Sequence, residues 1–176
     1  MGLKRGIVVL EEYNLDWIKE FNKEKEILES VLGDFVLEIE HLGSTAIKGL
    51  KAKPIIDILM LIDSFNNIDK VEEILKNYNY TNMGMQGVSD RYFFAKGSDD
   101  NRTHYLHIVD TKGDTYYNQI LFRDYLNKYP EYVKKYCNLK QDLANKYYDD
   151  RNKYTAFKSD FISEVIRLAK LEYNVK

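Results

Sequence analysis

The chain has 176 residues, of which 44% are hydrophobic and 31% are charged, and its formal net charge is −2 at pH 7. This length fits one domain with a sizeable core, and no change in composition marks a second, so we expect a single domain over residues 1–176. The small negative charge excludes a general electrostatic attraction to nucleic acid or to anionic membranes.

The N-terminal part of the chain predicts a strand, a helix and another strand. Residues 7–11 are apolar enough for a short edge strand. Asn14 is a candidate N-cap for a helix whose apolar residues recur at helical spacing until Gly33. Residues 35–42 alternate between apolar and charged side chains, which predicts a strand with Glu40 opposite its apolar face.

The middle of the chain contains its most apolar stretch. Residues 44–50 are expected to form a short helical turn, and residues 54–62 a strand that begins at Pro54. In this strand Asp57 lies on the face opposite the more apolar one. Residues 67–78 show the spacing of an amphipathic helix, and residues 82–90, which include two glycines, predict a loop.

The C-terminal half predicts a hairpin and then helices. Residues 91–96 and 102–110 are the expected strands of the hairpin, closed by a turn at residues 97–101. Helices are expected over residues 116–127, 130–148 and 155–172. The chain therefore predicts an α+β fold, a small mixed β-sheet with flanking helices and a C-terminal helical segment.

Cysteine content and hydropathy indicate the compartment. Cys137 is the single cysteine, so no internal disulfide can form, which favours the reducing cytoplasm. No apolar run reaches the length of a membrane span, and the start of the chain lacks the apolar core of a signal peptide. We therefore expect a soluble, cytoplasmic protein with no membrane partner.

An acid inside the apolar strand is the strongest indication of a functional site. Asp57 is surrounded by Ile, Leu and Met, where a carboxylate costs desolvation energy unless a charged or hydrogen-bonding group meets it. The Gly43-Ser44 turn before this strand exposes backbone N–H groups of the kind that bind phosphate. A phosphate-binding turn next to a buried acid predicts a site for a metal and a nucleotide.

The motif at residues 41–58, HLGSTAIKGLKAKPIIDI, resembles the GrpB-like family of the nucleotidyltransferase superfamily. More of the family pattern recurs at residues 102–107 and 122–126 and at Tyr154 and Lys158, so the resemblance covers nearly the whole chain. It implies a nucleotidyltransferase-like sheet and a possible transfer of nucleotidyl groups. The family's fusion to dephospho-coenzyme A kinase in some bacteria implies a ligand or partner in coenzyme or nucleotide metabolism.

The metal ligands depart from the superfamily pattern. Members of the superfamily usually carry two alternating acids on the second strand, whereas here Ile55 and Leu59 flank Asp57. Strand alternation offers Glu40 and His107 as substitutes that could meet Asp57 in one cleft as metal ligands or catalytic base. The expected cofactor is a divalent metal, Mg or Mn or, with the imidazole, Zn. Equally open is a structural role, with Glu40 paired to a lysine and His107 bonded within the sheet.

Other polar residues are candidates for phosphate binding or for support. Phosphate ligands are expected from the turn and from nearby cations: Gly43, Ser44, Thr45, Lys53 and Arg102. His41 precedes the turn and is expected to orient it. His104 is three residues from His107 and so faces the other way, which favours a supporting hydrogen bond over a ligand role.

Two residue pairs on the predicted helices are also candidates for contacts near the site. Tyr154 and Lys158, four residues apart, could reach the cleft, but an ordinary pair on a helix surface is favoured. Arg123 and Asp124 are neighbours on a helix and are expected to contact different partners.

The sequence thus predicts a nucleotidyltransferase-fold protein that binds a nucleotide or another phosphorylated small molecule with a divalent metal, and that transfers a nucleotidyl group. Two alternatives remain open. One is a non-catalytic module that binds a nucleotide, a coenzyme or a partner on the same fold, which the single acid on the second strand favours. The other is a metal-dependent phosphohydrolase, which uses water as the acceptor.

Overall fold

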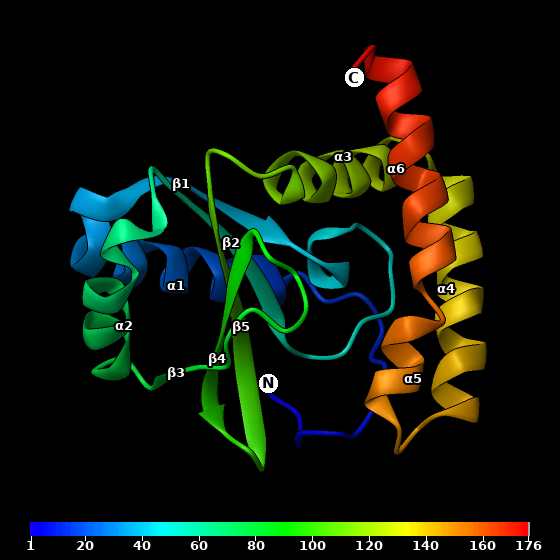
Figure 1. Ribbon diagram of the computed structural model, residues 1–176. Coiled ribbons are helices and arrows are strands. Elements are labelled where there is room, and N and C mark those ends of the chain that lie inside the picture. Colours follow the sequence, from blue (N-terminus) through cyan, green and yellow to red (C-terminus); the bar gives the residue numbers. More distant parts are fainter. Residues whose placement is uncertain (176) are drawn as a thin grey trace.

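A mixed five-stranded sheet organises the chain, and the computed structural model describes residues 1–175 of it. The strands lie in the order β1-β2-β5-β4-β3 (Figure 1). Strands β2 and β5 are parallel, while β1 with β2, β4 with β5 and β3 with β4 are antiparallel. The strands are β1 (Val36–Leu42), β2 (Ile56–Ile62), β3 (Tyr80–Asn82), β4 (Arg91–Ser98) and β5 (Asn101–Asp110).

One face of the sheet is covered by α1 (Asp16–Leu32) and α2 (Ile68–Lys76). Helix α1 follows Asn14, whose side-chain oxygen accepts a hydrogen bond from the Asp16 N–H at 2.9 Å, close to the predicted cap. Alternate residues of β2 pack against these helices, as predicted: Ile56, Ile58, Met60 and Ile62. Asp57 therefore lies on the opposite face of the sheet.

The opposite face meets the C-terminal helices, which stand together at one side of the sheet (Figure 1). They are α3 (Thr115–Lys128), α4 (Pro130–Lys146), α5 (Arg151–Ala156) and α6 (Ser159–Tyr173). Helices α3, α4 and α6 share a second core with residues of the β1–β2 connection, including Ile47 and Leu50. None of the described helices combines the length and the apolarity needed to cross a membrane.

The predicted edge strand at residues 7–11 is wrong. In this segment only Glu11 forms a bridge, with Ala52, and no strand is present. Val8 instead packs against Leu143, Ala144 and Tyr154, and its N–H donates to the Tyr148 carbonyl at 2.9 Å. The helical segment, and not the sheet, supplies the apolar contacts and a backbone partner that this segment requires.

Three further boundaries differ from the prediction. The turn after β1 is one short helix, η2 (Ser44–Ala46), and the short strand β3 lies where the prediction places no strand. The expected final helix over residues 155–172 is two helices, α5 and α6. Helix α5 begins earlier because the Asp150 carboxylate accepts a hydrogen bond from the Lys153 N–H at 3.1 Å. The remaining one-turn helices are η1 (Gly33–Phe35) and η3 (Phe65–Asn67).

Candidate functional site

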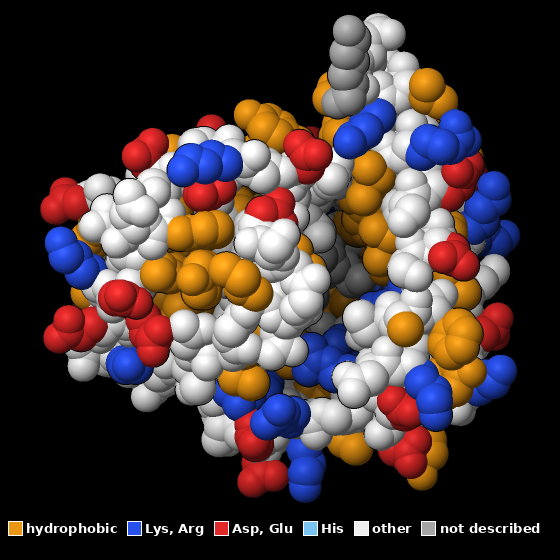
Figure 2. Space-filling model, in the orientation of Figure 1, with side chains coloured by type: hydrophobic (Ala, Val, Ile, Leu, Met, Phe, Trp, Pro, Cys, Tyr) orange, Lys and Arg blue, Asp and Glu red, His pale blue; other side chains and the backbone are white. Residues whose placement is uncertain are grey.

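A cavity of about 260 Å³ lies between the Asp57 face of the sheet, the turn after β1 and the C-terminal helices. Figure 2 shows the molecule hollowed between the sheet and the C-terminal helices, with Lys and Arg side chains toward the lower end of the hollow. The polar side chains and the backbone of the turn that line the cavity include Gly43, Ser44, Thr45, Lys53, Asp57, Tyr105, His107, Lys140, Arg151, Tyr154 and Lys158.

The structure brings the Gly43-Ser44 turn and Asp57 into direct contact. Leu42, the last residue of β1, is opposite Asp57 in the β1–β2 register, so the turn begins beside the carboxylate. Gly43 has φ 65° and ψ −165°, a conformation that essentially only glycine adopts. A Cβ at this position would lie 2.2 Å from Oδ2 of Asp57. Glycine is therefore required both by the backbone and by the approach of the acid.

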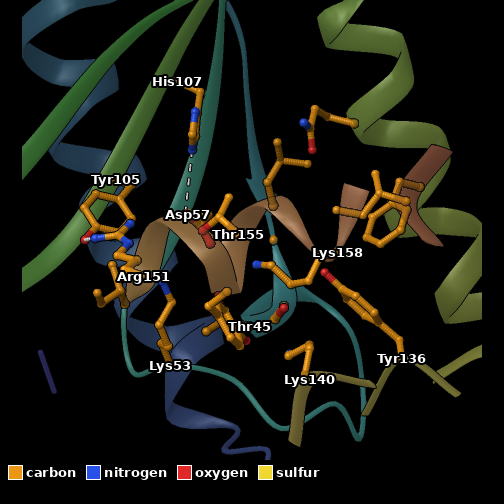
Figure 3. A pocket seen from close by; sticks show the side chains of 18 residues that line it. Thr45, Lys53, Asp57, Tyr105, His107, Tyr136, Lys140, Arg151, Thr155 and Lys158 are labelled. Carbon is orange, nitrogen blue, oxygen red and sulfur yellow. Dashed lines mark hydrogen bonds and ion pairs between the residues drawn. The ribbon is translucent and has the colours of Figure 1, made fainter. Parts of the chain in front are cut away.

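Asp57 and His107 lie next to each other on adjacent strands (Figure 3). Nε2 of His107 is 3.6 Å from Oδ1 of Asp57, and their side chains are 19% and 31% exposed, respectively. Burial opposes ionisation of Asp57, but the neighbouring His107 imidazole, with the charges of Lys53 and Arg151, outweighs it and lowers the pKa of Asp57. Asp57 is therefore a carboxylate at neutral pH.

Cationic side chains from several elements line the cavity around Asp57, the one acid that lines it within residues 1–175: Lys53, Lys140, Arg151 and Lys158 (Figure 3). In the described part of the chain, none of them forms an ion pair with a carboxylate. They lie over aromatic rings instead. Lys158 is 4.4 Å from the ring centre of Tyr154, Lys140 is 5.2 Å from that of Tyr136, and Arg151 is 4.8 Å from that of Tyr105.

The lysines of the cavity give up their protons more readily than lysines in water. Burial, together with the charges of Arg151 and Lys158, lowers the pKa of Lys53 to about 7. Burial lowers the pKa of Lys158 to about 8, partly offset by the charge of Asp57, while Arg151 adds to the lowering. Burial, with lesser contributions from nearby charges, also lowers the pKa of Lys140, whose amine donates to the Lys51 carbonyl. The cavity thus has an excess of cations that an anionic ligand would stabilise.

Glu40 does not join this cluster. It shares the Asp57 face of the sheet, but its carboxylate pairs with the Arg123 guanidinium at 2.5 Å and does not line the cavity. Nε of Arg123 also donates to the Asp124 carboxylate at 2.7 Å. The expectation that Arg123 and Asp124 do not contact each other is therefore wrong. On a helix surface, the long Arg side chain can fold back onto the next residue.

The donor set for a metal is correspondingly small. Within residues 1–175 no three His, Cys, Asp or Glu side chains are grouped as a metal site. Asp57 and His107 together offer one carboxylate and one imidazole. The Asp57 carboxylate alone fits an ion such as Mg²⁺, which takes one or two protein carboxylates and completes its shell with water and phosphate oxygens. It does not fit an ion held by the protein alone.

Arg102 and His104 lie outside the cavity. The Arg102 guanidinium donates to the Gly97 carbonyl at 2.6 Å and pairs with Asp99, so it stabilises the β4–β5 turn. His104 is buried on the other face of the sheet, as the alternation predicted, and its Nδ1 is 3.0 Å from the Thr103 hydroxyl. Neither side chain is placed to bind a phosphate in the cavity.

His41 supports the turn from behind. Its Nε2 is 3.0 Å from the Thr45 hydroxyl, and its ring stacks on Phe21 with centroids 4.6 Å apart. The hydroxyl of Thr45 therefore has a partner on the side of β1, while the residue itself is 1% exposed. Thr45 thus fixes the turn, and the expected orienting role of His41 is consistent with this contact.

We expect His41 to make the protein less stable in mild acid. Burial lowers its pKa to about 4, with Asp57 opposing and Arg123 adding to the change. Since the unfolded chain binds the proton near pH 6.5, stability is complete above that pH and falls as the pH drops toward 4, by no more than about 1.4 kcal/mol per pH unit. Urea unfolding of the wild type and His41→Gln should show a shallower pH slope in the variant, and parallel slopes would refute this assignment.

Several residues of the cavity were not found or were misjudged from the sequence. Tyr154 is 1% exposed and Lys158 lines the cavity, so the favoured interpretation of a helix-surface pair is wrong. Arg151 and Lys140 were not candidates at all. Arg151 donates to the Tyr105 hydroxyl at 2.6 Å. The only available signal was the family pattern at Tyr154 and Lys158, because no local motif marks Arg151 or Lys140.

Comparison with other sequences gives consistent matches. The chain matches the family described as GrpB protein over residues 7–168. The glutamate-rich protein GrpB of Alkalihalophilus pseudofirmus is 41% identical over 170 residues, which cover 94% of this chain and 98% of that protein. The UPF0157 protein YqkA of Bacillus subtilis is 37% identical over 158 residues, which cover 90% of this chain and 46% of YqkA.

Solved structures show the same fold. The crystal structure of the conserved protein GrpB from Enterococcus faecalis superposes with a TM-score of 0.86 at 32% identity, covering 94% of this chain and 99% of that one. The Cid1 poly(U) polymerase, crystallised with MgATP, superposes with a TM-score of 0.52 at 15% identity, covering 76% of this chain and 44% of Cid1. The predicted nucleotidyltransferase-like α+β fold is thereby confirmed.

Proposed function

Because the chain belongs to the GrpB family and has a nucleotidyltransferase-like fold, we propose that it binds the phosphate groups of a nucleotide or a similar phosphorylated small molecule beside Asp57. One observation carries the proposal. Lys53, Lys140, Arg151 and Lys158 line a cavity that contains a single carboxylate, and none of them has an ion-pair partner in the described chain. Buried charge without a partner is costly, and phosphate oxygens would relieve that cost.

The volume of the cavity supports a site that encloses the phosphate groups and leaves the rest of the ligand outside the cavity. The cavity of about 260 Å³ is below the roughly 300–1,000 Å³ of sites that enclose a whole small ligand. In the proposal Lys53, Arg151 and Lys158 bind phosphate oxygens, while the Gly43-Ser44 turn approaches the chain of phosphates along its backbone. Lys140, whose amine donates a hydrogen bond to the Lys51 carbonyl, contributes charge from the side of α4.

A divalent metal is proposed only as part of this complex. Asp57 would hold it, with phosphate and water as the other ligands, which leaves His107 free to act as a base. When bound, the metal neutralises phosphate charge and orients an attacking hydroxyl. Arg151, together with the lysines that take up a proton on binding, would balance much of the ligand's charge, so we expect measurable binding of a nucleoside triphosphate without metal.

For catalysis we propose nucleotidyl transfer. The oxygen of an acceptor hydroxyl forms a bond to the α-phosphorus of a nucleoside triphosphate, and the bond from that phosphorus to the pyrophosphate leaving group breaks. The hydroxyl proton passes to His107, which Asp57 orients at 3.6 Å. Arg151 and Lys158 stabilise the charge that develops on the phosphates.

Among residues 1–175 a single carboxylate, that of Asp57, lines the cavity, which favours a second candidate, a non-catalytic module that binds the same ligands. The two functions differ in one readout. Incubation with each nucleoside triphosphate, Mn²⁺ or Mg²⁺ and a panel of hydroxyl acceptors should release pyrophosphate if the protein transfers nucleotidyl groups. Release of free phosphate without pyrophosphate would instead indicate a phosphohydrolase, and tight binding without release of either would indicate the non-catalytic module.

Binding itself is tested by calorimetry with ATP, CTP, GTP and UTP, each with and without Mg²⁺ or Mn²⁺. We expect Lys158→Met to weaken binding by about 10- to 100-fold, the loss expected for a charge-assisted hydrogen bond. Lys146→Met is a matched control, because Lys146 also lies over a tyrosine ring, at 5.3 Å from Tyr147, but is exposed at the end of α4. Equal affinities of the two variants, or no binding of any triphosphate by the wild type, would refute the proposal.

The pKa values of the lysines make a separate prediction. Lys53 and Lys158 titrate near pH 7 and pH 8 in the free protein, and a bound phosphate favours their charged forms. Above pH 7 the charge of the phosphate itself is nearly constant. Affinity should therefore fall between pH 7 and pH 9, by up to about tenfold per pH unit for each lysine that must take up a proton. A pH-independent affinity in calorimetry would contradict this.

A further inference from the structure

A second, larger hollow lies on the other side of Asp57. It has a volume of about 720 Å³ and is lined by the start of β4, the segment before it, the N-terminal residues 5 and 6, and residues 149–152, 155 and 156. The hollow and the phosphate cavity share Asp57, Tyr105, His107 and Arg151 in their walls. The two spaces therefore meet at the carboxylate and the imidazole that we propose for catalysis. We call the larger space the Arg91 hollow.

Arg91 is a cation of this hollow that forms no ion pair within residues 1–175. Arg5 and Arg102 both pair with Asp99, and Arg151 bonds the Tyr105 hydroxyl. Arg91 has no ion pair with a carboxylate in the described chain, and its Nε has no hydrogen-bond partner there. The Arg91 guanidinium makes one long hydrogen bond within the described residues, from Nη2 to the Met85 carbonyl at 3.4 Å.

The adjacent acid, Asp90, acts on Arg91 through its charge but forms no ion pair with it. Both carboxylate oxygens of Asp90 accept hydrogen bonds from Thr115, one from its N–H at 3.1 Å and one from its hydroxyl at 2.8 Å. Asp90 is thus occupied in fixing the start of α3. Arg91 instead lies over the ring of Phe93, with the guanidinium carbon 5.7 Å from the ring centre. A guanidinium held on an aromatic ring, without an ion pair, is suited to a planar or tetrahedral anion.

The sheet register connects Arg91 to the proposed chemistry. Arg91 and Phe93 are alternate residues of β4 and lie on the same face. Phe93 is paired with His107 on β5, and their rings are 5.1 Å apart. A ligand whose anionic end contacts Arg91 can therefore extend across Phe93 to His107 and Asp57.

We propose that the Arg91 hollow binds the acceptor substrate, a small hydroxyl compound that carries a phosphate or carboxylate group held by Arg91. The inference rests on the proposed nucleotidyl transfer and names its acceptor class. The acceptor's hydroxyl oxygen forms the new bond to the α-phosphorus of the triphosphate in the phosphate cavity. The α-phosphorus–oxygen bond to pyrophosphate breaks, pyrophosphate leaves, and the hydroxyl proton passes to His107.

The test uses three probes that share a three-carbon skeleton and differ in charge: glycerol 3-phosphate, glycerate and glycerol. The full ¹⁵N-labelled chain is first saturated with α,β-methylene-ATP to occupy the phosphate cavity. We expect one or both anionic probes to shift the Nε–Hε signal of Arg91 and to bind at least about tenfold more tightly than glycerol. Whichever of the two binds more tightly identifies the anion as a phosphate or a carboxylate.

Variants assign the effect to Arg91. Arg91→Gln should lower the affinity for the anionic probes by about tenfold or more and leave the affinity for the ATP analogue unchanged. Arg167→Gln is the control, because Arg167 is exposed and pairs with Glu164 on α6. It should change neither affinity.

The outcomes separate this inference from the proposed function. If the analogue binds but neither anionic probe binds, or if Arg91→Gln leaves probe binding intact, the acceptor site is refuted and phosphate binding in the cavity stands. If Arg91→Gln instead lowers the affinity for the ATP analogue, the hollow holds part of the nucleotide and the inference fails. If the anionic probes bind at Arg91 while the analogue does not bind, the anion site stands and the proposed function fails.

Discussion

Replacement of Gly43 with alanine is expected to lower the free energy of unfolding by about 2–4 kcal/mol and to abolish phosphate binding. The conformation at φ 65° and ψ −165° costs a residue with a side chain about 1–3 kcal/mol. The new Cβ would also lie 2.2 Å from Oδ2 of Asp57, and moving Asp57 off its rotamer adds about 0.5–1.5 kcal/mol. Urea unfolding measures the first effect and calorimetry with ATP the second.

A second glycine provides the control for backbone strain. Gly49 has φ 78°, but no atom lies within 4 Å of the position its Cβ would take. Gly49→Ala should therefore show a smaller loss of stability and bind ATP like the wild type. If Gly43→Ala bound ATP with unchanged affinity, the contact between the turn and Asp57 would have no role in the site.

Replacement of Asp57 with asparagine should separate binding from turnover. Asparagine keeps the shape of the side chain but removes the single negative charge among Lys53, Arg151 and Lys158. Phosphate or triphosphate without metal should then bind at least as tightly as to the wild type, because a like charge next to the ligand is lost. Pyrophosphate release should fall by about 100-fold or more, the range lost with a group that supports proton transfer.

The control for Asp57 is another acid near the same strand. Asp63 directly follows β2 and is exposed, so Asp63→Asn should change neither binding nor turnover. A wild type that releases pyrophosphate and an Asp57→Asn variant that releases it at the same rate would exclude Asp57 from the chemistry. Weaker binding of metal-free phosphate by the variant would contradict the electrostatic account of the cavity.

The local part of the site follows from the sequence because strand alternation is a short-range rule. The period of two places Asp57 opposite Ile56 and Ile58, and the structure has this arrangement. The same rule places His104 and His107 on opposite faces. Together with the family motif, it was sufficient to predict the mixed sheet and the meeting of Gly43 with Asp57.

Glu40 shows the limit of that rule, because residues on one face are not necessarily neighbours. The β1–β2 register places Glu40 opposite Leu59, two residues along the strand from Asp57. Two residues correspond to about 6.6 Å of strand. At that position Arg123 of α3 supplies a nearer partner, at 2.5 Å. Strand alternation thus places Glu40 on the correct face, but Glu40 still does not join Asp57 and His107 in one cluster.

The cationic side of the site depends on tertiary packing that local patterns do not encode. Tyr154 and Lys158 share a face of the chain at the break between α5 and α6, but their spacing does not say whether that face meets solvent or the sheet. Packing of Val8, Leu143 and Ala144 around Tyr154 turns it inward. Lys140 comes from α4 and Arg151 from the start of α5, and both meet Lys53 only in the folded chain.

The most direct test of the central claim, that the cavity beside Asp57 binds phosphate, is a crystal structure of the protein with α,β-methylene-ATP. We predict phosphate oxygens at about 3 Å from the amine of Lys158 and the guanidinium of Arg151. The α-phosphorus should lie on the side of Asp57 that faces the Arg91 hollow. An analogue bound elsewhere, with these cations left without phosphate contacts at saturating ligand, would contradict the account.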